Sequence, residues 1–343
     1  MGARDNAAGG ALTVAVTGPT GTFGSGLIPL LQADSRIGRV TGVARRPFDP
    51  AARGWTKLFY RRGDVRDPAA LAAAFRGADV IVHLAFMVTG VEPPGEIRQT
   101  NVGGTLNAYR AAAAAGARRF VYASSVAAYG FHSDNPAEMT EEWPVRPAAR
   151  LFYARQKAEI ERLLSAEAAG PGQPALYLLR PCIVVGPHTV GAKDLLPGAL
   201  APLGRRLAGA VIRFRPPIPV PVAAPALPLQ LVHEQDVGSA LLLCTVGAGP
   251  PGAYNIAADG IVTPADIIRE FGLLPVPLPA APAQAAARLL TALPALPGVA
   301  GWAEAVSRPA IMSTVRAREL LGWSPRFTAL EALRDTVRGG PAP

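Results

Sequence analysis

The sequence predicts an α/β fold built on a doubly wound parallel sheet. Short apolar runs alternate with segments of helical periodicity up to residue 180, and the first run ends in a glycine-rich turn. Hydrophobic residues make up 50% of the 343 positions and charged residues 17%, which excludes a disordered chain because this composition can bury a large core. Strands that alternate with helices favour a parallel sheet covered by helices on both faces.

Six apolar runs are the expected strands, since parallel strands buried on both faces read as nearly continuous apolar sequence. They span residues 11–17, 39–44, 56–64, 79–85, 118–125 and 175–180. Helical periodicity predicts helices over residues 26–33, 67–75, 101–116 and 151–168. Asp67 and Pro68 are typical of an N-cap and a first helical position, and Gly116 is typical of the residue that ends a helix.

The alternation of strands and helices breaks down after Arg180. Proline-rich stretches at residues 216–230 and 271–297 interrupt it. We therefore expect a core domain over residues 1–180. Residues 181–343 are expected to form mainly a smaller lobe over the carboxyl edge of the sheet, with a segment at about 228–257 that returns to the sheet.

The chain is strongly basic, with a formal net charge of +9 and an isoelectric point of about 10.1. Lysine occurs only at Lys57, Lys157 and Lys193, so nearly all of the 34 basic residues are arginines. These arginines are spread along the chain and no nucleic-acid-binding motif accompanies them. We therefore expect a small-molecule partner and no nucleic acid.

The sequence carries no sign of export, membrane insertion or metal binding. The first residues lack an apolar signal core, and no apolar run reaches the length that spans a bilayer. The chain has only two cysteines and four scattered histidines, and their spacing matches no metal site. We expect a cytoplasmic protein without a membrane span or a metal.

The glycine-rich turn after the first expected strand has the features of a phosphate-binding loop. Glycines there permit a tight turn and a close approach of the backbone to a pyrophosphate, and the following helix N-terminus supplies N–H donors. A strand–turn–helix context is what such a motif requires. The sequence thus predicts nucleotide binding at this turn. The expected contacts are Gly18, Thr20, Gly21, Thr22, Phe23 and Gly24.

The G-x-x-G-x-x-G spacing of this loop resembles that of the extended short-chain dehydrogenases/reductases, the NAD-dependent epimerase/dehydratase family. Further motifs follow in the order typical of that family and extend the resemblance over nearly the whole chain. They lie at residues 63–67, 83–85, 101–105, 124–130, 153–157, 179–181, 233–237, 254–256 and 320–333. The resemblance implies a Rossmann-type doubly wound parallel sheet with a smaller C-terminal substrate-binding lobe.

Tyr153 and Lys157 lie four residues apart on an expected helix and therefore share one face. An ammonium beside a phenol lowers the pKa of the phenol, which allows acid/base chemistry near neutral pH. The resemblance implies that Tyr153 is the proton donor or acceptor and that Lys157 also binds the nicotinamide ribose. Ser125, four residues before Tyr129, is the expected catalytic serine, and Ser124 is expected to support the cofactor or the strand end.

The second expected strand ends in Arg45 and Arg46 rather than in an acidic residue. An acidic residue at this position commonly holds the ribose hydroxyls of NAD, whereas arginines suit a 2′-phosphate. We expect NADP, with NAD possible. The resemblance implies further cofactor contacts, which are Asp64, Val65, Leu84, Ala85, Asn101 and Arg180.

Three functions stay open on the sequence alone. The first is an NAD(P)-dependent oxidoreductase for a carbonyl or alcohol of a fairly apolar substrate. The second is a nucleotide-sugar epimerase with bound NAD(P), and the third is a non-catalytic protein that senses NADP. A homodimer is also left open.

The residues near the expected active site favour the first function. Ile183 replaces the asparagine usual in sugar-nucleotide members, and the apolar run at 126–128 replaces the acidic pair of dehydratases. An apolar stretch at 216–231 also suits a dry pocket. Arginines that would instead favour a diphosphate ligand are Arg205, Arg206, Arg213 and Arg215.

Overall fold

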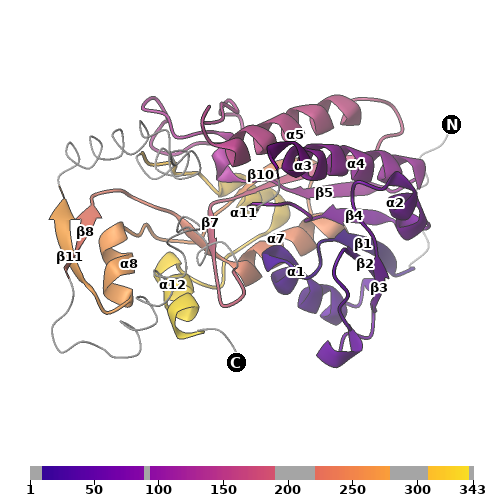
Figure 1. The fold of residues 1–343 in the computed structure, drawn as a ribbon, viewed down its shortest axis with the longest axis horizontal. Coiled ribbons are helices and arrows are strands. Elements are labelled where there is room, and N and C mark those ends of the chain that lie inside the picture. Colours follow the sequence, from indigo (N-terminus) through magenta and orange to yellow (C-terminus); the bar gives the residue numbers. More distant parts are fainter. Residues whose placement is uncertain (1–9, 89–92, 190–220, 279–307, 340–343) are drawn as a thin grey trace.

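The computed structural model describes residues 10–88, 93–189, 221–278 and 308–339. Its main feature is a seven-stranded sheet in which every pair of neighbouring strands is parallel (Figure 1). In spatial order the strands are β10 (Gly252–Ile256), β6 (Ala175–Pro181), β5 (Arg119–Ala123), β4 (Val80–His83), β1 (Leu12–Thr17), β2 (Ile37–Ala44) and β3 (Leu58–Arg62). This architecture confirms the predicted α/β class.

Helices cover both faces of this sheet (Figure 1). One face carries α1 (Thr22–Ala33) and α7 (Glu234–Val246), and α11 (Val315–Leu321) packs beside them against β10. The opposite face carries α2 (Pro68–Phe75), α4 (Gly104–Ala114) and α5 (Phe152–Ala168), with the short α3 (Pro94–Arg98) ahead of α4. The sheet is therefore doubly wound.

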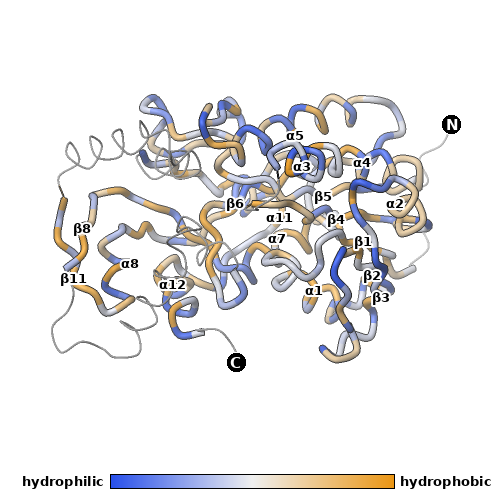
Figure 2. Tube along the Cα trace, in the orientation of Figure 1, coloured by the Kyte–Doolittle hydropathy of each residue, from blue (hydrophilic) through white to orange (hydrophobic). Residues whose placement is uncertain are grey.

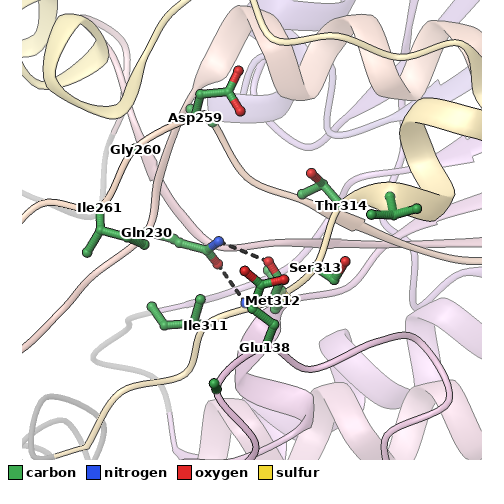
Figure 3. Close-up of a pocket in the computed structure, with 12 residues that line it drawn as sticks. Glu138, Gln230, Asp259, Gly260, Ile261, Ile311, Met312, Ser313 and Thr314 are labelled. Carbon is green, nitrogen blue, oxygen red and sulfur yellow. Dashed lines mark hydrogen bonds between the residues drawn. The ribbon is translucent and has the colours of Figure 1, made fainter.

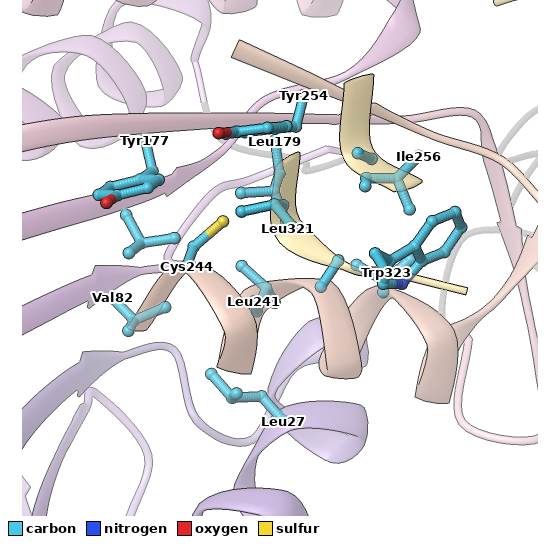
Figure 4. Close-up of a cluster of buried hydrophobic side chains, with 14 of the residues drawn as sticks. Leu27, Val82, Tyr177, Leu179, Leu241, Cys244, Tyr254, Ile256, Leu321 and Trp323 are labelled. Atoms are coloured by element: carbon cyan, nitrogen blue, oxygen red, sulfur yellow. The ribbon is translucent and has the colours of Figure 1, made fainter. Parts of the chain in front are cut away.

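Two buried clusters fill the spaces between the sheet and its helices. Side chains alternate between the faces of a strand, so Val14 and Val16 belong to the cluster under α1 and α7. Ala15, between them, belongs to the cluster under α2, α4 and α5. Figure 4 shows the first cluster, in which Trp323 from the C-terminal part packs beside α7. This two-sided burial explains why the strands read as continuous apolar runs.

Helices α1 and α7 approach each other backbone to backbone. A Cβ atom on Gly26 of α1 would lie 2.1 Å from the carbonyl oxygen of Glu234. A Cβ atom on Gly238 of α7 would lie 2.3 Å from the carbonyl oxygen of Gly26. Only glycine fits at these two positions, so the pair fixes α7 against the first βα unit.

The predicted elements correspond closely to those in the structure, with two differences at helix starts. Helix α1 begins at Thr22, directly after the glycine-rich turn. The expected helix at 101–116 starts as a π-helical turn, Gln99–Gly103, and becomes α-helical only at Gly104. The Asp67 carboxylate caps α2 as expected, because it accepts hydrogen bonds from the backbone N–H groups of Ala69 and Ala70.

The part of the chain after β6 contributes both to the large sheet and to a separate lobe. Strand β10 and helices α7 and α11 belong to the large sheet and its cover. The lobe holds two parallel pairs, β7 (Ile183–Val185) with β9 (Leu231–His233) and β8 (Pro221–Pro225) with β11 (Leu274–Leu278). Helices α8 (Pro264–Glu270) and α12 (Ala329–Arg338) pack against these strands.

Apolar residues are frequent in β8 and β11 of this lobe, as Figure 2 shows. Five large apolar side chains of the lobe are exposed, and they are Ile183, Ile261, Phe271, Leu274 and Val276. The apolar stretch predicted at 216–231 is described from Pro221 onward. Arg205, Arg206, Arg213 and Arg215 lie outside the described residues. Within the described ranges, every helix is too short or too polar to cross a membrane.

Candidate active site

The glycine-rich loop lies against the segment that follows β4. Gly18 has a left-handed backbone with φ of +70°, and a Cβ atom there would lie 3.0 Å from the backbone nitrogen of Ala85. The backbone N–H groups of Leu84 and Ala85 donate to Thr17 Oγ1 at 3.2 and 3.3 Å. The segments that follow the first and fourth strands are thus held together at the carboxyl edge of the sheet, where dinucleotides bind in this type of fold.

The N-terminus of α1 is open to an anion. Gly21 occupies the N-cap position, where no side chain caps the helix, and Thr20 and Gly21 are both exposed. A Cβ atom on Gly24 would lie 2.1 Å from Pro19 O, so glycine is required for the loop to fold onto the helix. The free N–H groups of a first helical turn and the helix dipole suit a pyrophosphate. Thr22 and Phe23, half-buried, complete the predicted loop contacts.

A buried hydrogen-bonded chain lies beneath this turn. His83 Nδ1 lies 2.9 Å from Thr17 Oγ1, and His83 Nε2 lies 3.0 Å from Thr105 Oγ1, which itself donates to Asn101 O at 2.5 Å. Thr105 therefore accepts from Nε2–H, and Thr17 donates to Nδ1 of a neutral imidazole. Burial, with the Lys157 charge as a smaller cause, lowers the pKa of His83 to about 3. His83 is a structural link rather than an acid or base.

Asn101 fastens the segment after β4 to helix α5. Its Oδ1 accepts from the backbone N–H of Met87 at 2.7 Å, and its Nδ2 donates to Met87 O at 2.9 Å. The same Nδ2 donates to Gln156 Oε1 at 2.8 Å. The side chain is fully buried, so these bonds are shielded from water. Sequence reasoning placed Asn101 at the cofactor, and that prediction stays a prediction beside this structural role.

The structure brings Ser125, Tyr153 and Lys157 together at the carboxyl end of β5. A hydrogen bond links the Ser125 and Tyr153 side chains. Lys157 Nζ lies 5.7 Å from the centre of the Tyr153 ring. Lys157 is 2% exposed, and its Nζ donates to Ala123 O at 2.6 Å and to Tyr122 Oη at 3.2 Å. A hydroxyl pair beside a buried ammonium is an arrangement that can transfer a proton to or from a substrate oxygen.

The pKa directions in this group differ from the sequence expectation. Burial raises the pKa of Tyr153, and its hydrogen bond to Ser125 acts in the opposite direction. Burial also lowers the pKa of Lys157 from 10.5 to about 7, with the Glu161 carboxylate acting in the opposite direction.

Ser124 lies directly beside this group and is fully buried. Its Oγ has no hydrogen-bond partner among the described residues. An unpaired buried hydroxyl costs about 1–3 kcal/mol, so a bound group that supplies a partner is favoured. The expectation that Ser124 supports the cofactor or the strand end stays a prediction, and this unpaired atom favours the cofactor.

Sequence reasoning missed a buried charged network behind the site. Arg180 donates to Glu161 through two nitrogens, at 2.6 Å from Nη2 to Oε2 and 3.0 Å from Nε to Oε1. Its Nη1 donates to Tyr129 Oη at 2.6 Å, and that hydroxyl donates to Asn255 Oδ1 on β10 at 2.8 Å. Glu161 follows Lys157 by four residues on α5, and this repeat of the Tyr153–Lys157 spacing is the signal that was available.

The network joins α5, β6 and β10 under the carboxyl edge of the sheet. The Arg180 side chain donates hydrogen bonds to Glu161, Tyr129 and the Glu141 backbone carbonyl within this network. Its predicted contact with the cofactor therefore stays a prediction.

The predicted adenine end of the site is more exposed than the Tyr153 end. Asp64 forms an ion pair with Arg66 at 2.8 Å, which lowers the pKa of Asp64. Val65 is buried against Gly104. Arg45 and Arg46 follow β2 as exposed side chains, and within the described ranges neither forms an ion pair. Both exposed guanidinium groups at this edge are available to a phosphate.

A cavity of about 480 Å³ lies elsewhere. Its walls include Gln230, residues 258–261 and residues 311–315, which lead into α11. Figure 3 shows Gln230 bonded to both backbone groups of Met312 in its wall, at 2.9 and 2.8 Å. None of the predicted site residues lines this cavity. Among the residues placed by the structure, no group of three or more His, Cys, Asp or Glu side chains is arranged to hold a metal ion.

The fold and the site together define a dinucleotide-binding α/β protein of the extended short-chain dehydrogenase/reductase type. Residues 14–257 match the NAD dependent epimerase/dehydratase family. The chain belongs to this family, whose members bind NAD(P).

Known relatives match the chain over different lengths. An uncharacterised protein of Mycobacterium tuberculosis strain H37Rv is 30% identical over 338 residues, covering 95% of this chain and 83% of the relative. Sterol demethylase protein B of Methylococcus capsulatus strain Bath is 32% identical over 178 residues, covering 51% of this chain and 52% of the relative. The full-length relative shows that the lobe as well as the sheet has a counterpart elsewhere.

A solved structure matches along nearly the whole chain. MoeE5, in complex with UDP-glucuronic acid and NAD, is 25% identical, with a TM-score of 0.69. The match covers 95% of this chain and 98% of MoeE5. This chain is thus similar over most of its length to a protein whose structure contains UDP-glucuronic acid and NAD.

Proposed function

We propose that the protein is an NADP-dependent oxidoreductase that interconverts a carbonyl and an alcohol on a fairly apolar substrate. The observation that carries this proposal is the hydrogen-bonded Ser125–Tyr153 pair beside the buried ammonium of Lys157. A protein that only senses the cofactor needs no such acid/base group, which speaks against a non-catalytic role.

Each residue of the pair has a separate role in this reaction. The nicotinamide, when bound, supplies the hydride to the substrate carbon in reduction and accepts it in oxidation. Tyr153 Oη donates the proton to the substrate oxygen in reduction and takes it back in oxidation. Ser125 orients that oxygen, and Lys157 binds the nicotinamide ribose and stabilises the developing phenolate.

The residues of the loop fit the cofactor. The open N-terminus of α1, the close approach at Gly18 and the unpaired Ser124 hydroxyl support binding of the pyrophosphate and the nicotinamide. Arg45 and Arg46 support NADP over NAD, since both are exposed and without ion-pair partners among the described residues.

The substrate class is inferred from the side chains near the catalytic edge. Ile183 opens β7 just beyond β6, and it is 44% exposed. An apolar surface there suits an apolar substrate and leaves the hydroxyl groups of a sugar unpaired, at about 1–3 kcal/mol for each buried one. The partial similarity to sterol demethylase protein B agrees with an apolar substrate. We also infer that the part of the chain after residue 181 binds this substrate.

A nucleotide-sugar epimerase is the second candidate. The observation that favours it is the full-length similarity to MoeE5, whose structure holds UDP-glucuronic acid and NAD. An epimerase returns the hydride to its own substrate, so it consumes no cofactor, whereas a reductase consumes one NADPH for each carbonyl. Cofactor stoichiometry therefore separates the two functions.

The test is a panel of apolar ketones and common sugar nucleotides, each incubated with NADPH and followed by absorbance and product analysis. We expect stoichiometric NADPH oxidation with an apolar ketone and no epimerisation of sugar nucleotides. Epimerisation without net NADPH consumption, or a sugar nucleotide that co-purifies with the protein, would replace the proposal by the epimerase.

The variant Tyr153→Phe tests the assigned acid/base. It removes the phenolic hydroxyl only, so we expect unchanged NADPH affinity and a turnover lower by about 10²–10⁴-fold. Tyr177→Phe is the matched control, because the Tyr177 hydroxyl donates to Gly249 O at 2.8 Å, away from the site. Equal turnover in the two variants would remove Tyr153 from the mechanism.

A further inference from the structure

Phe86 lies over both members of the Tyr153–Lys157 pair. Its ring centre is 3.8 Å from Lys157 Nζ, close enough for a cation–π interaction. The same ring meets the Tyr153 ring edge to face, at 5.5 Å between centres and 85° between planes. One side chain from the segment after β4 therefore contacts the proposed acid/base and its lysine together.

The backbone on both sides of Phe86 is held by side-chain hydrogen bonds. Thr17 Oγ1 accepts from the backbone N–H of Ala85 at 3.3 Å, directly before Phe86. Asn101 brackets Met87, directly after Phe86, with bonds of 2.7 and 2.9 Å. The position of the ring is thus fixed by the same polar chain that runs through His83.

The ring completes the surroundings of the Lys157 ammonium. An ammonium has three N–H donors, and Tyr122 Oη and Ala123 O take two of them. The face of the Phe86 ring, with its negative quadrupole, also lies against this ammonium, at 3.8 Å from the ring centre to Nζ. A buried cation without such a partner loses its proton more readily.

We propose that Phe86 is an aromatic positioning residue that stabilises the charged form of Lys157 and orients the Tyr153 phenol beside it. The expected effect of Phe86 on turnover rests on the function proposed above. Its expected effect on Lys157 rests on the structure alone. Phe86 contacts Tyr153 and Lys157 and acts only through them, because its side chain neither donates nor accepts a proton.

Other groups also face Lys157, and their charges set the background against which Phe86 acts. From β5 and α5 these are the Tyr122 and Tyr153 phenols, and from one turn further along α5 the Glu161 carboxylate, which is paired with Arg180. From β4 the neutral His83 lies nearby. Substitution of Phe86 removes none of these ionisable groups, so a change in the Lys157 pKa that is absent in Phe86→Tyr reports on the ring.

The test uses nuclear magnetic resonance of the full chain with ¹³C-labelled lysine. Only three lysines occur, so the Lys157 signal is identified by its loss in Lys157→Arg. Phe86→Leu keeps an apolar side chain but removes the π face, and Phe86→Tyr keeps the face. We expect the Lys157 pKa to fall by about one unit in Phe86→Leu, equivalent to about 1.4 kcal/mol, and to stay near wild type in Phe86→Tyr.

Phe59→Leu is the matched control. Phe59 is exposed on β3, and its ring lies 4.0 Å from Arg39 Cζ, so it loses a cation–π contact far from Lys157. The Lys157 titration should not change in this variant. Phe86→Met serves as a second variant without a π face if Phe86→Leu does not fold.

Turnover supplies an independent readout once a substrate is found. The high-pH limb of the kcat profile should move down by about one unit in Phe86→Leu and return in Phe86→Tyr. An unchanged Lys157 titration in Phe86→Leu and Phe86→Met would overturn the proposal. A shifted titration in a protein with no oxidoreductase activity would support the role of Phe86 and overturn only the proposed function.

Discussion

Helix α5 carries two ion pairs of the same length in opposite surroundings. Glu161 Oε2 and Arg180 Nη2 lie 2.6 Å apart, with side chains that are 5% and 6% exposed. Glu167 Oε1 and Arg110 Nη2 also lie 2.6 Å apart, with side chains that are 27% and 63% exposed. The first pair faces the sheet and the second faces solvent.

The comparison shows that the two faces of α5 place charged side chains in surroundings of different burial. Tyr153, Lys157 and Glu161 repeat every four residues and form one inward stripe. Charges on this stripe are buried, so each depends on a particular partner. Charges on the outer face are screened by water, so their pairing contributes little. We expect effects of substitution to follow burial rather than distance.

The largest effect is expected at Glu161. Glu161→Gln leaves the buried Arg180 guanidinium without a counter-charge and should lower the free energy of unfolding by about 3–5 kcal/mol. Glu167→Gln is the matched control on the same helix, and it should cost less than about 1 kcal/mol. Urea unfolding followed by circular dichroism measures both. Similar losses of unfolding free energy in the two variants would show that burial does not decide how much each ion pair contributes to stability.

The next effect concerns Lys157 and depends on pH. Burial lowers its folded pKa to about 7, whereas an unfolded lysine titrates near about 10.4. Between these values the unfolded chain holds a proton that the folded chain lacks. Lys157 therefore makes the free energy of unfolding rise with pH, by up to about 1.4 kcal/mol for each unit.

Urea unfolding at about pH 7.5 and about pH 9.5 measures this slope. Lys157→Met should remove this contribution, so its free energy of unfolding should rise less with pH, or fall more, than that of the wild type. Lys57→Met is the control, because Lys57 is less buried and its Nζ donates to Asp34 O at 2.7 Å on the far side of the sheet. The same slope in Lys157→Met as in the wild type would assign the titration to another group.

The smallest effect is expected at the exposed arginines after β2. Arg45→Ala with Arg46→Ala should weaken NADPH binding by about tenfold or more while NADH binding changes little, because only NADPH has a phosphate for them. Isothermal titration calorimetry measures both affinities. The control is Arg36→Ala with Arg39→Ala, which removes the same charge from the other end of β2. Equal losses of affinity for NADPH and NADH would show that Arg45 and Arg46 attract either cofactor by charge and do not recognise the 2′-phosphate.

Much of the sheet could be predicted from the sequence because its signals are local. The strands that carry the site are short apolar runs, and Asp67 marks a helix start with its own side chain. The glycine loop and the Tyr153–Lys157 spacing are likewise readable, since each motif lies within one element or one turn. The start of α4 was less readable, because the π-helical turn at Gln99–Gly103 leaves no compositional mark.

What the sequence determined by itself is therefore the fold class, the family and the shared face of Tyr153 and Lys157 on α5, because strand and helix periodicities are properties of neighbouring residues. Only the tertiary structure decided which groups meet across elements. Arg180 pairs with Glu161 from a different strand, and Phe86 reaches Lys157 from the segment after β4. Such contacts depend on how elements distant in the chain pack, and burial then sets the energy of each charge that they enclose.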